Sequence, residues 1–309
     1  MNGQRVLVTG GAGFIGSNLA NHLAEDNDVV AVDDTYLGTA ENLNDDVEFV
    51  EASVLDNDFP TDVDVVFHLA ALSSRNMHEE NPQEGCRVNV EGFVNTVERA
   101  RNHGCETVVY ASTSSIYGSR TEPSPESMSV ESQTAYEASK LARERYAEYY
   151  ANHHDMTMAG LRFFSVYQGF GGNEKHKGKY ANTVAQFADA IATGEAPELF
   201  GDGTQTRDFT HVRDVARACE LAANHELTGV YNVGTEEAYS FNTMVEMINN
   251  VLGTDIDPEY IECPFDGYVH DTCADISKFH EATGWEPQIS FKEGIELVCK
   301  PYLVDETTA

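Results

Sequence analysis

The glycine-rich segment between residues 10 and 16 constrains the fold of this chain more than any other feature. Gly10, Gly13 and Gly16 follow an apolar run over residues 5–9 and open a helical pattern over residues 14–25. Glycines at this spacing permit a tight turn, close approach of the backbone to a pyrophosphate, and close packing of the helix on the strand. The helix N-terminus adds free N–H groups and a positive dipole end. The pattern therefore predicts a strand, turn and helix that bind a dinucleotide.

An acidic residue in the next predicted strand specifies the dinucleotide further. Asp33 ends an apolar run over residues 28–32. A carboxylate at this place can bind the 2′-hydroxyl of a ribose and repels a 2′-phosphate. The sequence therefore favours NAD over NADP as the cofactor.

Strand-length apolar runs alternate with helical patterns through the first half of the chain, which predicts an α/β fold with a Rossmann-type, doubly wound parallel sheet. After Arg162 the strands become fewer, and helical patterns dominate. We expect an NAD-binding domain over residues 1–165, to which a segment at about 205–235 returns, and a smaller C-terminal lobe, mainly substrate-binding, over residues 166–309. The predicted strands cover 5–9, 28–32, 47–50, 65–68, 107–111, 156–161 and 229–233, and the helices cover 14–25, 84–102, 133–153, 180–193, 212–224, 241–252 and 291–302.

A tyrosine and a lysine four residues apart mark a candidate catalytic centre. Tyr136 and Lys140 share one face of a predicted helix. A nearby ammonium stabilises phenolate and lowers the pKa of a phenol, so Tyr136 could act as a general base. The hydroxyl-rich stretch that begins at Ser112 and includes Thr113 follows a predicted parallel strand, and active sites of such sheets gather at the carboxyl ends of the strands. An ordinary helix face is the alternative interpretation of the tyrosine and lysine taken alone.

The charge of the chain excludes some partners. Asp and Glu number 52 against 19 Lys and Arg, which gives a formal net charge of −33 and disfavours nucleic acid and anionic membrane. The acidic residues are spread over predicted loops and helix faces, where concentrated salt would screen their repulsion. We interpret this as adaptation to high intracellular salt, with an acidic mesophilic protein as the alternative.

Cysteine spacing and hydropathy complete the compositional picture. The six cysteines form no Cys-x-x-Cys pair, so neither a metal site nor a disulfide framework is expected. No apolar run reaches about 18 residues, and no signal-peptide pattern follows Met1. We therefore expect a cytoplasmic protein.

These motifs, in this order, resemble the signature of the extended short-chain dehydrogenases/reductases, the NAD-dependent epimerase/dehydratase family, and in particular UDP-glucose 4-epimerase and its relatives. The resemblance extends over nearly the whole chain. It is carried by Gly10-x-x-Gly13-x-x-Gly16, His68-Leu69-Ala70-Ala71, Asn89-Val90-x-Gly92, Tyr117-Gly118, Tyr136-x-x-x-Lys140, Leu161-Arg162-Phe163-Phe164-Ser165-Val166-Tyr167, Gly201-Asp202-Gly203, Arg207-Asp208-Phe209 and Tyr231-Asn232-Val233-Gly234.

The resemblance implies roles for individual residues. The catalytic residues would be Thr113, which hydrogen-bonds the sugar hydroxyl, Tyr136 as the base, and Lys140, which binds the nicotinamide ribose. The cofactor-binding residues would be Gly10, Gly13, Phe14, Ile15, Gly16, Asp33, Ser53, Val54, Leu69, Ala70, Ala71, Asn89, Tyr136, Lys140 and Phe164. The substrate-binding residues would be Thr113, Ser165, Lys177, Arg207 and His270. The family also implies a homodimer built from the helices over 84–102 and 133–153.

Three positions depart from the family pattern. Ser53 replaces an aspartate that usually contacts adenine, and Ser165 stands where many epimerases have an asparagine. No arginine occurs near residues 265–271, where relatives place a second contact to the nucleotide, so His270 is the candidate there. These departures leave the identity of the nucleotide open.

The residues after Thr113 separate the reaction classes. Related dehydratases and decarboxylases carry acidic residues there, whereas this chain has Ser114 and Ser115. The resemblance therefore implies epimerisation of a nucleotide sugar by transient oxidation at C4 and return of the hydride.

The segment His176-Lys177-Gly178 resembles a motif of ADP-heptose 6-epimerases, in which the lysine is a second acid/base. A solvated or phosphate-binding lysine is the other interpretation. A net NAD-dependent dehydrogenase or reductase of the same superfamily, and a non-catalytic NAD-binding sensor, remain alternatives.

Overall fold

The central element of the protein is a seven-stranded, wholly parallel sheet. The structure, a computed structural model, describes residues 1–265 and 267–303; residues 304–309 of the predicted C-terminal lobe lie outside the described residues. The sheet order is β3 (Val47–Glu51), β2 (Asp28–Asp33), β1 (Arg5–Thr9), β4 (Val65–His68), β5 (Thr107–Thr113), β6 (Thr157–Phe163) and β9 (Gly229–Val233). This order reverses direction at β1, which confirms the predicted doubly wound Rossmann fold.

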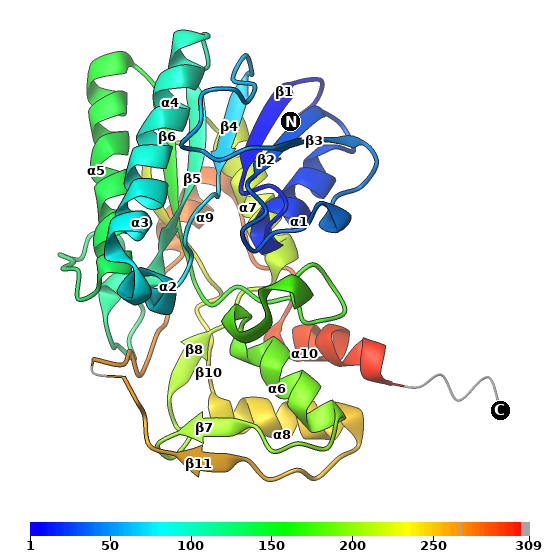
Figure 1. Cartoon of the computed structure of the whole chain (residues 1–309). Coiled ribbons are helices and arrows are strands. Elements are labelled where there is room, and N and C mark those ends of the chain that lie inside the picture. Colours follow the sequence, from blue (N-terminus) through cyan, green and yellow to red (C-terminus); the bar gives the residue numbers. More distant parts are fainter. Residues whose placement is uncertain (266, 304–309) are drawn as a thin grey trace.

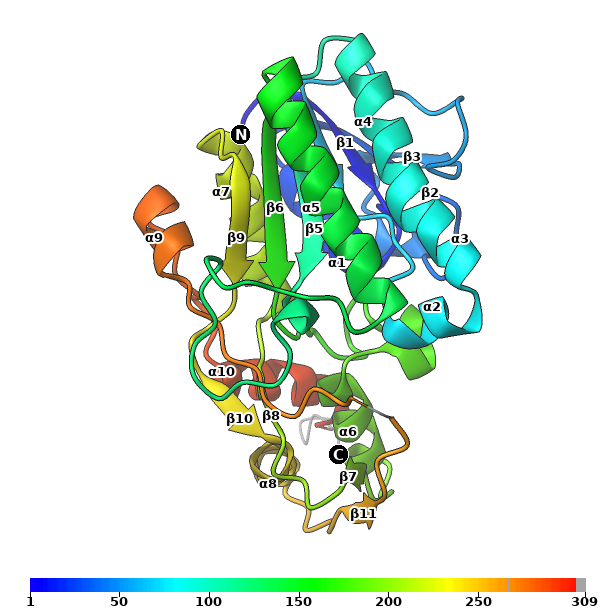
Figure 2. The same cartoon turned by 90° about the vertical axis from the view of Figure 1, so that its left-hand side faces the viewer.

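Helices cover both faces of the sheet, as Figures 1 and 2 show. The strands are buried on both sides, which explains why they read as continuous apolar runs. Val6 and Val8 of β1 face one hydrophobic cluster, and Leu7 between them faces the other. One face carries α1 (Phe14–Leu23) and α7 (Val212–Asn224), and the other carries α4 (Gly92–Asn102) and α5 (Ala135–His154).

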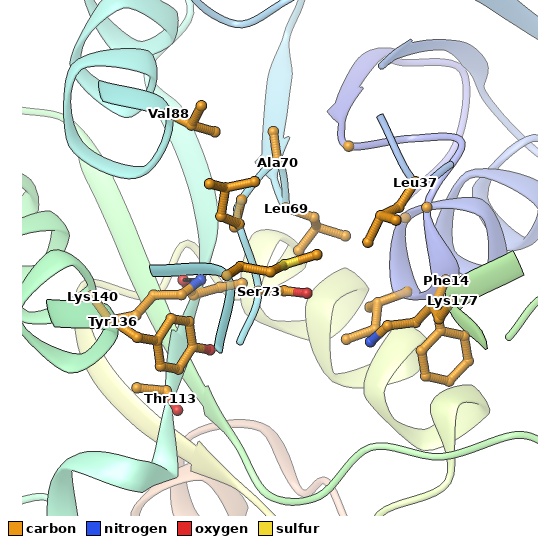
Figure 3. Close-up of a pocket in the computed structure, with 18 of the residues that line it drawn as sticks. Phe14, Leu37, Leu69, Ala70, Ser73, Val88, Thr113, Tyr136, Lys140 and Lys177 are labelled. Carbon is orange, nitrogen blue, oxygen red and sulfur yellow. Dashed lines mark hydrogen bonds between the residues drawn. The ribbon is translucent and has the colours of Figure 1, made fainter. Parts of the chain in front are cut away.

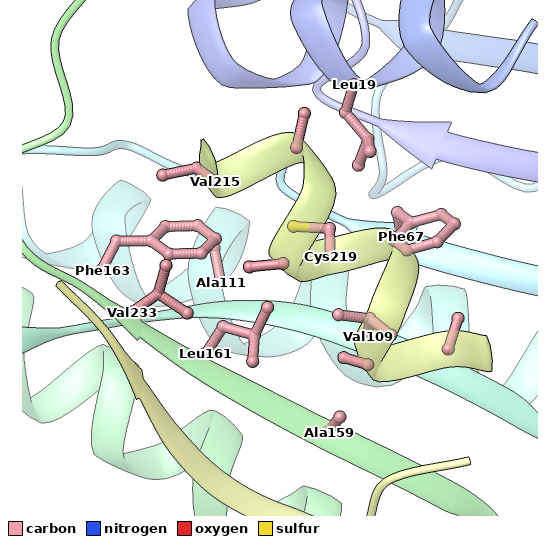
Figure 4. Packing of buried hydrophobic residues seen from close by; sticks show 14 of the residues in the cluster. Leu19, Phe67, Val109, Ala111, Ala159, Leu161, Phe163, Val215, Cys219 and Val233 are labelled. Carbon is pink, nitrogen blue, oxygen red and sulfur yellow. The ribbon is translucent and has the colours of Figure 1, made fainter. Parts of the chain in front are cut away.

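Helix α7 shows how a late segment of the chain completes the main core. Its side chains Val215 and Cys219 point at the sheet, where they meet Leu161 and Val233 (Figure 4). Segments 212–224 and 229–233 thus belong to the sheet layers. Helix α9 (Ser277–Thr283) also returns to this core through Phe279.

A smaller lobe lies at the carboxyl ends of the strands, below the sheet in Figure 1. It has its own hydrophobic cluster, which includes Tyr167, Phe209, Met244 and Ile295. Its elements are α6 (Thr183–Ala192), α8 (Phe241–Leu252), α10 (Phe291–Cys299), and two short sheets made of β8 (Thr206–Asp208) with β10 (Ala238–Ser240) and β7 (Glu198–Phe200) with β11 (Glu259–Ile261).

The single helix predicted over residues 84–102 is divided in the structure. It begins as α3 (Pro82–Cys86), passes through a π-helical turn (Arg87–Glu91) and continues as α4. A further short helix, α2 (Arg75–Glu80), was not expected from the sequence. No helix within residues 1–265 and 267–303 has both the length and the apolar character needed to cross a membrane.

Candidate active site

A pocket of about 650 Å³ lies at the carboxyl edge of the sheet, between the sheet and the smaller lobe. Gly10, Asp33, Leu69 and Thr113 bring the ends of β1, β2, β4 and β5 to its wall. Parallel strands all end at this edge, so residues far apart in sequence meet there. The smaller lobe closes the other side, for example through Arg207. A concave site with convergent polar groups is the natural candidate for the active site.

The glycine turn at one end of the pocket can accept a dinucleotide. Gly10 has φ +67°, and a Cβ atom there would lie 2.6 Å from the backbone nitrogen of Ala70, so only glycine fits. The turn leads directly into α1, whose N-cap, Gly13, has no side chain to occupy the first turn. The space over this turn therefore suits a pyrophosphate bound by backbone N–H groups.

Asp33 is held beside the same turn. Its carboxylate accepts hydrogen bonds from the backbone N–H groups of Ala12 at 3.1 Å and Thr35 at 2.8 Å. Burial raises the pKa of Asp33, while these hydrogen bonds oppose the rise. The carboxylate lines the pocket at the end of β2, where the ribose of a bound NAD would be recognised.

Thr113, Tyr136 and Lys140 converge at the opposite end of the pocket, as Figure 3 shows. Thr113 is the last residue of β5, and Tyr136 and Lys140 lie one helical turn apart near the start of α5. The Lys140 Nζ donates a hydrogen bond to the Ala111 carbonyl at 3.2 Å and lies 5.7 Å from the centre of the Tyr136 ring. The three side chains are therefore placed to act on one substrate group.

Burial and two neighbouring residues set the electrostatics of Tyr136. Burial raises its pKa, whereas the hydrogen bond with Thr113 and the charge of Arg143 lower it. Burial, followed by the charge of Arg143, holds the pKa of Lys140 well below its usual range. The charge of Arg143 therefore favours phenolate at Tyr136, a contribution that the tyrosine–lysine spacing did not predict.

Arg143 is a residue that sequence reasoning missed. Its side chain is fully buried, and its guanidinium donates to the Ala70 carbonyl at 2.7 Å and to the Asn89 carbonyl. It thus ties α5 to the loop after β4 and to the π-helical turn. Its spacing from Tyr136 and Lys140, seven and three residues along one helix, is the signal that could have found it.

Capping and a buried ion pair hold α5 in place. Thr134 and Glu137, which lie on either side of Tyr136 in the sequence, form a capping box at the start of the helix. Deeper in the protein, Glu144 of α5 pairs with Arg162 of β6 at 2.7 Å and accepts a hydrogen bond from Ser112 of β5 at 2.6 Å. These contacts fix the helix against the two strands that end beside the pocket.

Most of the residues proposed from the sequence line this pocket: Gly10, Gly13, Phe14, Ile15, Gly16, Asp33, Val54, Leu69, Ala70, Ala71, Thr113, Tyr136, Lys140, Ser165, Lys177 and Arg207. Four others lie outside the lining. Ser53 forms a local turn in which its hydroxyl accepts from Leu55 N–H at 3.3 Å. Phe164 is 1% exposed and packs in the main core.

Asn89 and His270 also lie outside the lining, each for its own reason. Asn89 is fully buried, and its amide holds the Leu72 backbone and the Ser139 hydroxyl. The ring of His270 contacts the Asp271 carboxylate at 2.8 Å, while its carbonyl accepts a hydrogen bond from Arg207 at 2.7 Å. Both residues therefore support pocket-lining neighbours.

Arg207 lies on the substrate-lobe side of the pocket. Its guanidinium also donates to the carbonyls of Thr206 and Val269, and it lies 5.2 Å from the centre of the Tyr268 ring. These contacts hold a cation at the wall of the pocket. Ser165, on the same side, has φ +25°, an uncommon backbone conformation for a residue with a side chain.

Several lining residues were not among the site residues proposed from the sequence. They belong to the loop after β2, to the segment around α2 and α3, to the turn after β5 and to two stretches of the smaller lobe. The general rule that loops at the carboxyl edge line the site could have indicated the first group, whereas the others depend on tertiary packing. They include Asp34, Tyr36, Leu37, Gly38, Leu72, Ser73, Met77, Glu80, Asn81, Glu84, Val88, Ser114, Ser115, Val166, His176, Val269 and Thr272. Within residues 1–265 and 267–303, no three His, Cys, Asp or Glu side chains are grouped as a metal site.

Comparison with known proteins identifies the family. Residues 6–234 match the model of the NAD dependent epimerase/dehydratase family. The chain belongs to this family. UDP-glucose 4-epimerase of Mycolicibacterium smegmatis is 36% identical to it over 306 residues, which span 94% of this chain and 96% of that protein. The epimerase family assignment and the NAD cofactor predicted from the sequence are thereby confirmed.

Solved structures of family members have the same fold. UDP-N-acetylglucosamine 4-epimerase from Methanobrevibacter ruminantium, in complex with UDP-N-acetylmuramic acid, matches with a TM-score of 0.90 and 30% identity over 97% of this chain and 98% of that chain. UDP-glucose 4-epimerase of Thermus thermophilus, in complex with NAD, matches with a TM-score of 0.84 and 32% identity over 96% and 98%. The protein is thus an NAD-dependent epimerase. Similar structures also include a heptose 6-epimerase of Helicobacter pylori and a UDP-glucuronic acid 4-epimerase of Bacillus cereus, so similarity leaves the sugar open.

Proposed function

We propose that this epimerase inverts C4 of the hexose in a UDP-sugar, with UDP-glucose and UDP-galactose as its substrate pair. The observation that carries the proposal is the placement of Thr113, Tyr136 and Lys140 at one end of a pocket whose other end is the glycine turn and Asp33. The relatives described as UDP-glucose 4-epimerases support the choice of sugar.

In this proposal Tyr136 removes the proton from the sugar 4-hydroxyl. The Thr113 hydroxyl, hydrogen-bonded to Tyr136, orients that group and passes the proton. NAD held by the glycine turn and Asp33 would supply the acceptor and donor of the C4 hydride. The pocket must then let the 4-keto sugar turn while keeping it inside, so that the opposite face is presented and Tyr136 gives the proton back.

The residues after Thr113 support epimerisation over loss of water. The Thr113 hydroxyl donates a hydrogen bond to the Ser115 hydroxyl at 3.1 Å, and the Ser115 N–H donates to the Thr113 oxygen at 3.2 Å. This turn presents hydroxyls, not the carboxylates of a dehydratase, beside the proposed reaction centre. Without an acid there to protonate a leaving hydroxyl, hydride return is the favoured outcome.

Incubation of the purified protein with UDP-glucose, UDP-N-acetylglucosamine and UDP-glucuronate, followed by separation of the products, tests the proposal. We expect conversion of UDP-glucose to UDP-galactose without accumulation of free NADH. Stoichiometric NADH release would instead make the protein a net dehydrogenase. Turnover of only one of the other two sugars would transfer the activity to that sugar.

We also infer a homodimer formed through α4 and α5. Val90, Val94 and Tyr146 line a hollow on the outer face of these helices, and Tyr146 is 43% exposed. Polar and charged side chains, among them Arg87, Glu91 and Glu98, also line this hollow. Apolar and aromatic residues combined with a polar rim are typical of a subunit interface. Light scattering should give the mass of two chains for the wild type and for Tyr260→Glu, which alters an exposed tyrosine of the smaller lobe, and of one chain for Tyr146→Glu. A monomeric wild type would refute the inference.

A further inference from the structure

Residues 168–180, here called the clasp, run from the smaller lobe onto the first helix of the sheet domain. Gln168 and Asn18 of α1 exchange two side-chain hydrogen bonds, at 2.8 and 3.0 Å. Asn173 donates to the Ser17 hydroxyl at 3.1 Å. The clasp is thus fastened to the first turns of α1, directly beside the glycine turn.

Asn42 makes a second connection between the clasp and the sheet domain. Its amide nitrogen donates to the Ala12 carbonyl in the glycine turn at 3.0 Å and contacts the His176 ring at 3.0 Å. The backbone carbonyl of Asn42 accepts a hydrogen bond from the Asn173 side-chain amide at 3.1 Å. One asparagine therefore connects the clasp with the turn that would hold a pyrophosphate.

A buried carboxylate shapes the clasp from within. Glu174 is fully buried and accepts hydrogen bonds from the backbone N–H groups of Gln168 and Gly169, each at 2.9 Å, and from that of Asn182 at 2.6 Å. Three donors to one carboxylate make a rigid turn. The positions of His176 and Lys177, which follow it, are consequently set by the fold.

This arrangement brings Lys177 into the pocket at the cofactor end. Its Nζ lies 5.7 Å from the centre of the ring of Phe14, the first residue of α1. Figure 3 shows Lys177 and Phe14 on the side of the pocket away from Thr113, Tyr136 and Lys140. Lys177 is therefore far from the proposed reaction centre.

The ammonium of Lys177 has no carboxylate partner among residues 1–265 and 267–303, although acidic residues outnumber basic ones 52 to 19 in this chain. Its side chain is half-buried, and burial lowers its pKa while Glu174 opposes that effect. A half-buried cation without an ion pair, next to a helix N-terminus in a pocket, is suited to bind an anion.

We propose that the clasp retains bound NAD and that Lys177 pairs with its pyrophosphate over the N-terminus of α1. The role is independent of which sugar is epimerised. It suits an enzyme that must keep its reduced cofactor until the hydride returns, because the clasp closes over the phosphates from the lobe opposite the sheet. Lys177 then binds the cofactor and is neither a sugar ligand nor a second acid/base.

The variants Lys177→Met and Lys177→Arg test this, with Lys175→Met as a matched control because Lys175 is exposed in the same segment. Two quantities are measured: the release rate of NADH from the holoenzyme, and inhibition constants, with ADP and adenosine as competitors of NAD rebinding and UDP as a competitor of the nucleotide sugar. We expect Lys177→Met to speed NADH release and to weaken the binding of ADP, each by about ten-fold. The binding of adenosine and of UDP should change by less than about two-fold. Lys177→Arg and Lys175→Met should resemble the wild type.

A second variant acts on the clasp without touching the pocket. Asn42→Ala removes the tie to Ala12 and His176 and should also speed NADH release. The proposal is overturned if Lys177→Met releases NADH and binds ADP as the wild type does. Weaker binding of UDP with unchanged binding of ADP would instead show that Lys177 is a substrate ligand. If the pH profile of the activity lost one of its limbs while NADH release stayed unchanged, Lys177 would be an acid/base. Each of these outcomes can occur whether or not UDP-glucose is the substrate.

Discussion

At the scale of single residues, the proposed base Tyr136 is influenced by groups that the sequence motifs do not contain. Tyr136 is buried, which raises its pKa, and the opposing influences are Thr113 and Arg143. Burial also lowers the pKa of Lys140. The motif of tyrosine and lysine thus gives the position of the proposed base, and Arg143 on the same helix adds a charge that lowers its pKa.

Tyr136→Phe should abolish most of the activity and leave cofactor binding intact. The change removes the proton acceptor but keeps the ring, so kcat should fall by about 10²- to 10⁴-fold. NAD content per chain and melting temperature should stay at wild-type values. Tyr149→Phe, an exposed tyrosine of the same helix, is the control. Epimerisation by Tyr136→Phe at the wild-type rate would remove Tyr136 from the base role.

Arg143→Met should shift the pH profile of kcat. The positive charge of Arg143 lowers the pKa of Tyr136, so its removal should move the acidic limb upward by about one pH unit. Arg143→Lys keeps the charge and should restore most of the profile. The Met variant should also lose about 1–3 kcal/mol of stability, because the carbonyls of Ala70 and Asn89 lose their donor. A lower kcat with an unmoved profile would mean that Arg143 only holds the structure.

At the scale of elements, the N-terminus of helix α7 has a cap that depends on pH. Helix α7, which closes the core beneath β5 and β6, begins at an unusual N-cap, His211, whose Nδ1 accepts a hydrogen bond from Arg213 N–H at 3.3 Å. The side chain is 2% exposed, and its burial lowers the pKa of His211 to about 4. The capping nitrogen must be unprotonated to accept that hydrogen bond, so the helix start is sensitive to acid.

His211 should make the protein less stable as the pH falls from about 6.5 to about 4. In this window the unfolded chain binds a proton at His211 and the folded chain does not, so the contribution is present above pH 6.5 and is lost on acidification. Relative to His211→Asn, which can still cap, the wild type should lose roughly 3 kcal/mol across the window. Denaturant unfolding at several pH values measures this, with His225→Asn at the exposed C-cap as control. Parallel curves for wild type and His211→Asn would contradict it.

At the scale of the whole molecule, charge sets the conditions under which the fold is stable. With a formal net charge of −33, the folded chain repels itself in dilute buffer. The Debye length falls from about 10 Å at 0.1 M salt to about 3 Å at 1 M, which screens this repulsion. Adaptation to concentrated salt and a cytoplasmic location remain predictions from the sequence.

The melting temperature should rise by several degrees when KCl is increased from about 0.1 M to about 2 M, because screening favours the compact state. Sucrose, which strengthens apolar burial without screening charge, is the control and should have a smaller effect. Differential scanning calorimetry in both series decides the matter. Salt adaptation through surface charge would be refuted if KCl and sucrose raised the melting temperature equally, or if KCl did not raise it.

The sequence by itself determined the parallel sheet, the NAD preference and the positions of Thr113, Tyr136 and Lys140. These features depend on local rules. Strands that are buried on both faces have continuous apolar sequences, and a spacing of four residues places two side chains on one helix face. Short elements escaped prediction, because three-residue strands such as β7 and the polar helix α2 contain too few residues to show a period.

Only the tertiary structure decided where certain side chains lie relative to the pocket. It placed Phe164 in the core, buried Arg143 beside the base, and fastened the clasp so that Lys177 reaches the cofactor end of the pocket. Lys177 and Phe14 are far apart in sequence, and their meeting depends on hydrogen bonds such as the one that joins Gln168 to Asn18. No periodicity encodes such contacts, because they arise from packing one lobe against another.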